Sequence, residues 1–468
     1  MTLKLGKAGA KKGGYEIDMT NGPLLGKIVR FAIPLAISGI LQLLFNAADM
    51  IVVGRFAGAN SLAAVGATGA LINLIVTLFM GLSVGTNVLV AQYYGGDHKK
   101  DLSETVHTSI LASLIFGVIL IGIGMALARP ILTAMATPAD VLDQAVLYMR
   151  IYFIGMPVMM LYNFGAAILR AVGDTQRPLY FLVAAGIINV VLNLFFVIVL
   201  HMDVAGVATA TDVSQGVSAL LVLRCLMKTD GPYKVELRRL AIKKDKLIRM
   251  VKIGLPAGIQ GASFSISNVL IQSSINSFGS MAMAGNTAAA NIEGFVGMGV
   301  DAFSQAALSF TGQNMGAGKP QRIRKIILLC MGMGIGVGLV LGVGCRLAGP
   351  QLLGFYTEDP QVIDYGLRRM NYVCVLQCVA ATMGVMVGVL RGMGSSIAPM
   401  AITMTFVCGF RVVWLFTVFA AAPSLEMLYI SYPITWALAA FCDLLFYFHL
   451  KRKLKLRRHG NESLAAGA

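Results

Sequence analysis

LRAVGDTQRP at residues 169–178 returns as LRGMGSSIAP at residues 390–399, so a segment of this chain recurs 221 residues later. The same offset, within one residue, relates pairs of positions along the whole sequence: Pro34 with Pro256, Gly58 with Gly279, Gln92 in AQYYGG with Gln313 in GQNMGAG, and Met149 with Met370. Because the offset barely changes from one pair to the next, the chain is one duplicated unit.

Composition places both copies of this unit in a membrane. Hydrophobic residues make up 57% of the 468 positions and charged residues 13%, and apolar runs of about 20 residues are each long enough to cross a bilayer as a helix. We expect an all-α integral membrane protein with twelve such spans: 28–53, 62–90, 106–128, 142–170, 178–200 and 204–227, then 250–275, 284–313, 325–348, 364–390, 398–420 and 427–449. Six spans per copy give both halves the same orientation, so two six-helix lobes should be related by a pseudo-twofold axis along the membrane normal. Duplicated halves of this kind are typical of secondary transporters.

Basic residues predict how the protein sits in the membrane. Lys and Arg concentrate before the first span, between the two halves, after Met315 and after residue 450. The positive-inside rule then places both termini and the central linker in the cytoplasm, for a multi-pass protein of the cell membrane. We therefore expect five parts: a disordered tail at 1–22, an N-lobe at 23–228, a basic linker at 229–247, a C-lobe at 248–450 and a basic tail at 451–468. The same pattern explains the net charge of +16 better than nucleic-acid binding does.

Several classes of function find no support in the sequence. The seven Cys have no metal-ligand spacing, the five His lie at or near span ends, and no Walker loop is present. A membrane enzyme would need a nucleophile with a base, or a metal cluster, and neither is visible. We expect no catalytic residues, no metal and no cofactor, and partners limited to small molecules and the bilayer, with the protein as a monomer.

Asp49 is the sharpest candidate for a functional residue. A carboxylate within a span is costly and is a functional candidate by default. Asp49 lies six residues before Arg55, roughly 9 Å below the outer surface at 1.5 Å per residue. Gln42 and Asn46 share its face of the helix at i, i+4, i+7 spacing. Asp49 could take up a proton, or its oxygens could coordinate Na⁺; a structural carboxylate satisfied by neighbouring helices is the alternative.

Two further spans supply polar residues at the depth of Asp49. Asn189 and Asn193 share a helix face at i, i+4, and Thr211 and Asp212 enter the next span from the same side. These residues could line one cavity in the first half, although intramembrane Asn and Thr also serve as interhelical hydrogen-bonding groups.

The second half does not repeat this polar cluster. At the 221-residue offset, Asp49 falls on Leu270, Asn189 on Phe410 and Asn193 on Trp414. The second half has its own acids, Glu293 and Asp301, and Arg411 either pairs with one of them or extends toward the interface. Glu293 lies near the midplane, where it could meet a cationic substrate; a packing role through Asn286, Asn291 or Gln305 is the alternative. Candidates for a substrate cavity are Gln42, Asn46, Asn163, Glu293 and Asp301.

Together these motifs resemble the multidrug and toxic compound extrusion (MATE) family, and most of all its DinF-like branch. The resemblance rests on Pro34 and Asp49 in the first span, on the AQYYGG/GQNMGAG pair and on the duplicated LRAxGD/LRGxGS segments, and it runs from about residue 22 to 453. It implies a V-shaped pair of lobes, with a coupling site that maps onto Asp49, Asn189, Asn193 and Thr211. Asn193 stands where an acid is expected, so the site lacks one carboxylate, which the neighbouring Asp212 could restore.

The resemblance implies a cation-coupled antiporter that exports amphipathic or cationic drugs by alternating access. We expect H⁺ coupling through Asp49 alone, with Na⁺ possible, and a gating kink of the first span at Pro34. The alternative is a flippase for a lipid-linked or polyanionic substrate, which would favour extra spans and a cavity lined with several basic residues.

Overall fold

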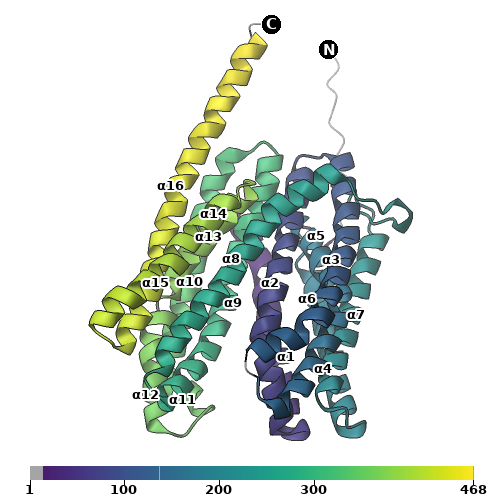
Figure 1. Cartoon of the computed structure of the whole chain (residues 1–468). Coiled ribbons are helices and arrows are strands. Elements are labelled where there is room, and N and C mark those ends of the chain that lie inside the picture. The colour runs from purple at the N-terminus through teal and green to yellow at the C-terminus, as the bar shows by residue number, and fades with distance from the viewer. Residues whose placement is uncertain (1–13, 136, 467–468) are drawn as a thin grey trace.

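The computed structural model describes residues 14–135 and 137–466, and in these residues every regular element is a helix. Most helices run antiparallel to their neighbours in a tall bundle (Figure 1). The first half contains α1 (Leu25–Val52), α2 (Ala59–Gly95), α3 (Lys99–Ala134), α4 (Ala139–Ile154), α5 (Met156–Ala171), α6 (Gln176–Leu194) and α7 (Asp203–Lys228). The second half contains α8 (Lys244–Asn276), α9 (Ser280–Gly316), α10 (Ile323–Leu347), α11 (Gly349–Gly354), α12 (Pro360–Arg369), α13 (Gln377–Gly392), α14 (Ile397–Thr403), α15 (Phe410–Trp414) and α16 (Leu425–Ala466).

Short π-helical turns continue several of these helices without breaking the span. They follow α1, α6, α12, α14 and α15, at Val53–Ala57, Phe195–Val199, Met370–Cys374, Met404–Gly409 and Leu415–Phe419. A π-turn inserts one extra residue into the helical ladder and is common where a helix serves a functional site.

The described helices account for the twelve predicted spans. Eight are long and apolar enough to cross a membrane singly, and two bent pairs, α4 with α5 (47°) and α12 to α13 (40°), raise the number to ten. The remaining two, α8 and α9, have 33 and 37 residues, which at 1.5 Å per residue is more than the bilayer requires.

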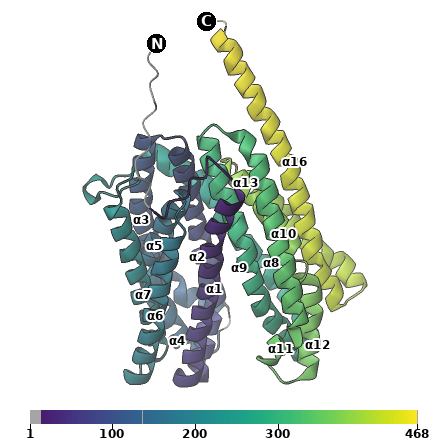
Figure 2. The same cartoon turned by 180° about the vertical axis from the view of Figure 1, so that it is seen from behind.

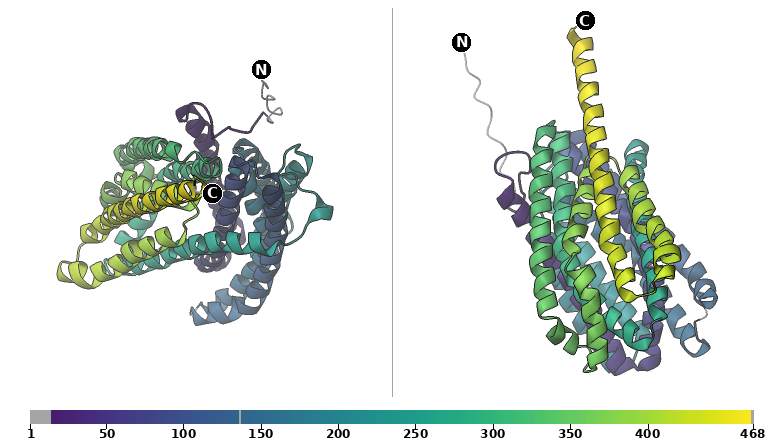
Figure 3. Two further views of the ribbon diagram at one scale, coloured as in Figure 1. Left: turned by 90° about the horizontal axis from the view of Figure 1, so that it is seen from above. Right: turned by 90° about the vertical axis from the view of Figure 1, so that its left-hand side faces the viewer.

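The two halves form two lobes that meet at one end of the molecule. The start of α1, the α7–α8 linker and the end of α16 all lie at this end, at the top of Figure 1, which we call the basic end. Toward the other end the lobes diverge, as Figures 1 and 2 both show. Helix α16 continues past the bundle at the basic end, so the predicted tail from residue 451 begins as part of a helix (Figure 3).

Glycines bring the lobes together near the basic end. Gly81 and Gly85 on α2 face Gly254 and Gly258 on α8, and a Cβ at any of the four would collide with the facing backbone. Pairs of small residues at i, i+4 spacing on both helices let two membrane helices approach this closely. This contact fixes the lobes as a closed seam at the basic end.

The pseudo-twofold relation appears in the hydrogen bonds between the two halves. Gln92 Nε2 donates to Gly392 O at 3.0 Å, and the equivalent Gln313 Nε2 donates to Ala171 O at 2.7 Å. Each glutamine of the repeated AQYYGG and GQNMGAG motifs therefore caps the repeated turn of the opposite half. The glutamine motif and the turn motif of the repeat therefore contact each other across the seam, once in each direction.

The N-terminal segment differs from the expected disordered tail. Residues 1–13 lie outside the described residues, but Ile17 and Met19 are buried in the core. Glu16 accepts hydrogen bonds from Tyr94 of α2 and Tyr233 of the linker, while Asn314 of α9 donates to Met19 O at 3.0 Å. The segment at residues 14–22, here called the N-terminal strap, thus connects both lobes at the basic end, and the prediction of disorder up to residue 22 is wrong for it.

Candidate functional site

The predicted coupling residues of the N-lobe form one hydrogen-bonded chain across three helices. Asn193 on α6 donates from Nδ2 to Asp49 Oδ1 on α1. The same Nδ2 lies 3.2 Å from Asn189 Oδ1, and Asn189 Nδ2 lies 3.4 Å from Thr211 Oγ1 on α7. The structure thus brings together the four residues that the sequence placed at one depth.

This chain runs from the buried core to a more accessible position. Asn193 is fully buried, Asn189 is 5% exposed, and Asp49 is half-buried. The side-chain oxygen of Asn193, Oδ1, is buried without a hydrogen-bond partner among the described residues. A buried acceptor without a donor is rare in folded proteins.

Asp212 lies apart from the chain, although it follows Thr211 directly. Its carboxylate packs against Gly155, where α4 gives way to α5, and accepts a hydrogen bond from the Gly155 N–H. Successive residues of a helix point about 100° apart, which separates Asp212 from Thr211. Any side chain at Gly155 would occupy the space of the carboxylate, so Asp212 can take this position only because the residue at the bend is glycine.

Two tyrosines of α4 complete the acidic interior of the N-lobe. Tyr148 and Tyr152 are one helical turn apart, and both lie close enough to Asp49 and Asp212 to interact with their charges. Sequence reasoning missed them, and their i, i+4 spacing opposite the polar spans was the available signal.

Helix α1 links this site to the other lobe. Its second half packs on α6, where Phe45 fills the space left by Gly186. Its first half belongs to the C-lobe core: Phe31 stacks edge-on against Phe310 of α9, with ring centroids 5.6 Å apart. Pro34 lies in this first half. Because the two halves of α1 pack on different lobes, the helix that carries Asp49 is anchored in both.

The predicted substrate-cavity residues lie in different surroundings. Gln42 and Asn46 are exposed on the Asp49 face of α1. Asn163 is 8% exposed and donates to Met159 O of its own helix at 2.8 Å, which makes it a packing residue. Glu293 is bound by the Arg369 guanidinium, with Nη2 2.9 Å and Nε 3.1 Å from Oε2, so its charge is already paired within the C-lobe.

Asp301 lies between the two lobes. It is exposed on α9, has Gln305 as a hydrogen-bonding neighbour, and interacts electrostatically with Arg170 of α5 and Arg391 of α13. These two arginines are equivalent in the repeat, 221 residues apart. Asp301 therefore faces one basic residue from each lobe.

Comparison with known proteins decides the family. The MatE family model matches residues 34–195 and again residues 256–417, one match per lobe. The chain belongs to the MatE family of transporters. The double match coincides with the internal repeat, because each lobe is one copy of the family unit.

Relatives of this MATE chain span almost its full length. The probable multidrug resistance protein YoeA of Bacillus subtilis is 26% identical over 92% of this chain and 94% of its own length. An FAD transporter of Shewanella oneidensis is 23% identical over 89% of this chain and 93% of its own.

Solved structures share the fold of this chain. An outward-facing multidrug resistance MATE transporter superimposes with a TM-score of 0.87 at 24% identity, covering 95% of this chain and all of that one. A MOP superfamily transporter from Pyrococcus furiosus gives 0.88 at 24% identity, with the same two coverages. The twelve-helix, two-lobe architecture is therefore that of the MATE transporters.

Proposed function

We propose that this MATE transporter exports amphipathic or cationic compounds in exchange for protons, with Asp49 as the proton-carrying group. The observation that supports the proposal is the hydrogen-bonded chain Asp49–Asn193–Asn189–Thr211 inside the N-lobe. A membrane-buried carboxylate tied to polar partners is the usual form of an ion or proton relay.

The donor pattern around Asp49 favours H⁺ over Na⁺. Asn193 turns its NH₂ group toward the carboxylate, so a metal cation there would face a donor instead of an oxygen. A proton needs only the carboxylate, and binds without rearranging the amide. Sodium prefers several oxygen ligands. The surroundings of Asp49 would supply a second one only if the Asn193 side-chain amide rotated by 180° and presented its oxygen.

Alternating access would follow from the two anchors of α1. Protonation of Asp49 removes the charge that holds Asn193, and a shift of the second half of α1 would bend the helix at Pro34, where one backbone hydrogen bond is already missing. The first half, fixed against α9, would carry that change to the lobe seam. The basic end would face the cytoplasm by the positive-inside rule, so the described state would be open outward.

Proteoliposomes test this proposal. Purified protein is reconstituted with an imposed pH or Na⁺ gradient, and ethidium movement is followed by fluorescence. We expect transport driven by the pH gradient in the wild type and in the Asp143→Asn control, whose acid is an exposed partner of Arg129, and none in Asp49→Asn. Transport that needs Na⁺, or that persists in Asp49→Asn, would overturn the proposal.

A further inference from the structure

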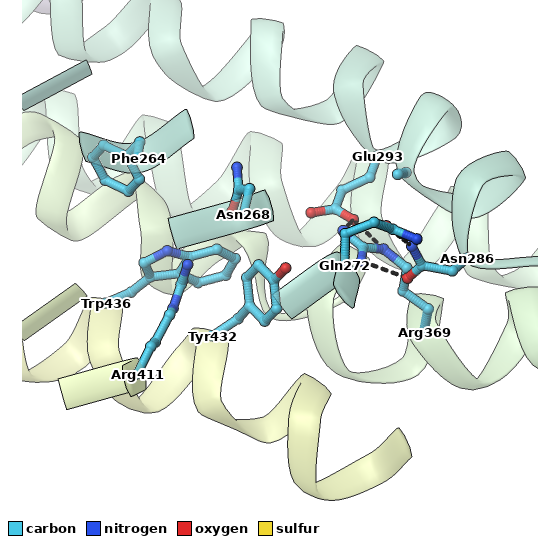
Figure 4. Close-up of a pocket in the computed structure, with 10 residues that line it drawn as sticks. Phe264, Asn268, Gln272, Asn286, Glu293, Arg369, Arg411, Tyr432 and Trp436 are labelled. Carbon is cyan, nitrogen blue, oxygen red and sulfur yellow. Dashed lines mark hydrogen bonds and ion pairs between the residues drawn. The ribbon is translucent and has the colours of Figure 1, made fainter. Parts of the chain in front are cut away.

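A cavity of about 270 Å³ lies inside the C-lobe, and its lining divides into two ends. Figure 4 shows Glu293, Arg369, Asn286 and Gln272 together at one end, and Phe264, Trp436 and Arg411 toward the other, with Tyr432 between. Asn268 lines the cavity and is itself exposed, so the cavity communicates with the surface of the lobe. The volume is close to the lower limit of small-molecule sites.

The polar end of the cavity is internally satisfied. Arg369 pairs with Glu293 and also donates from Nη1 to Asn286 Oδ1 at 2.8 Å. Asn286 in turn donates to Gln272 Oε1 at 2.9 Å. One cation and one anion cancel here, and the amides complete the network, so this end demands no further charge.

The aromatic end of the cavity carries a cation without a carboxylate partner. Arg411 is 2% exposed; its guanidinium stacks over the Tyr432 ring at 4.1 Å, and its Nε donates to Thr435 Oγ1 at 3.2 Å. Its Nη2 is buried with no hydrogen-bond acceptor among the described residues. Leaving a charged donor unpaired in the interior is costly, and an anionic group is the natural complement.

We propose that this C-lobe cavity binds the anionic group of an aromatic compound, a carboxylate, phosphate or sulfonate held by Arg411 with its ring against Trp436 and Phe264. The net charge of the cavity is +1, from Arg369 and Arg411 against Glu293, and one monoanion neutralises it. Arg411 offers a directed N–H to an oxygen, and the indole offers a flat apolar surface to the ring. The inference deepens the proposed transport function, since it extends the substrates of the same protein to anionic amphiphiles.

The two tryptophans of the chain give a direct binding assay. Trp414→Phe leaves Trp436, in the cavity wall, as the sole tryptophan. In detergent and without any ion gradient, we titrate this protein with 4-nitrobenzoate, a quencher, and with its neutral isostere 4-nitrobenzamide. We expect saturable quenching by the anion, with about tenfold or greater preference over the amide, the range for a charge-assisted hydrogen bond.

Variants separate anion recognition from general packing. Arg411→Gln should remove the preference for nitrobenzoate while nitrobenzamide binds as before. Glu293→Gln should strengthen nitrobenzoate binding by freeing Arg369. Arg368→Gln should change neither affinity, because Arg368 lies outside the cavity lining and pairs with Asp364 and Glu426.

Equal binding of the two probes, or a preference for nitrobenzoate that survives Arg411→Gln, would overturn the proposal. Asp49→Asn should bind nitrobenzoate as the Trp414→Phe protein does. Failure of proton coupling would therefore leave this assay unchanged, and failure here would leave proton coupling standing.

Discussion

The two lobes give their interiors different charges, at positions that are not themselves equivalent in the repeat. In the N-lobe the interior holds Asp49 and Asp212, whereas in the C-lobe it holds Arg369 and Arg411. Tyr148, beside the N-lobe acids, is equivalent in the repeat to Arg369, and Thr211 is equivalent to Tyr432, under the Arg411 guanidinium.

The helices and the seam were kept in both copies, while the charged residues of the interiors diverged. An acidic interior suits a proton or cation, and a basic one suits an anion. Duplication thus supplied the scaffold, and substitution within it produced two interiors of unlike charge.

The largest effect is expected at Asp49, the acid for which the second lobe has no equivalent. Asp49→Asn should reduce ethidium export to the level of empty vesicles, since the proposed proton-carrying group is gone. The repeat-related Leu270→Asn should export near the wild-type rate, because Leu270 is 43% exposed and faces no polar partner in the described structure. Similar losses in both variants would contradict the assignment of coupling to one lobe.

At the lobe seam, by contrast, equivalent substitutions in the two halves should reduce stability equally. An added Cβ at Gly95 would meet the backbone of Gln313, and one at Gly316 would meet the backbone of Gln92. Gly95→Ala and Gly316→Ala should each destabilise the closed basic end by ~1–3 kcal/mol, the range for overpacking. Thermal unfolding of the purified variants measures this, with Gly332→Ala, where nothing lies within 4 Å, as the control.

Asn193 tests the hydrogen-bonded chain without removing a charge. Asn193→Ala takes away the donor to Asp49 and should lower the export rate about tenfold, the effect expected for losing one bond to a charged group. Asn163→Ala is the matched control, since its amide serves only its own helix among the described contacts. Comparable losses in the two variants would mean that both amides act in packing.

The smallest expected effect concerns the N-terminal strap. Glu16→Gln weakens the hydrogen bonds from Tyr94 and Tyr233 and should loosen the basic end by ~1 kcal/mol. Hydrogen exchange at residues 14–22 should rise severalfold, while Glu236→Gln, an exposed partner of Arg239, leaves it unchanged. Unaltered exchange in Glu16→Gln would show that these hydrogen bonds of the strap do not stabilise the basic end.

Much of the fold could be predicted from the sequence because bilayer crossing is a local requirement. Hydropathy and the repeat gave twelve spans, whose described counterparts differ mainly at the bends near Gly155 and Leu376. The cluster around Asp49 could be predicted for a similar reason, since depth in a span follows directly from residue number.

Pairing between distant spans could not be predicted. Glu293 and Arg369 are 76 residues apart, and only packing reveals that they neutralise each other. The direction of Asp212 depends on the bend at Gly155, and the strap is held by contacts from both lobes. These features arise from tertiary packing and leave no periodic pattern in the chain.

Proton release on substrate binding tests most directly the claim that the coupling acid lies in the N-lobe. Ethidium is added to protein in weakly buffered detergent solution containing a pH indicator, with wild type, Asp49→Asn and Glu293→Gln compared. The account predicts proton release from the wild type and from Glu293→Gln, and none from Asp49→Asn. Release from Asp49→Asn, or its loss in Glu293→Gln, would contradict it.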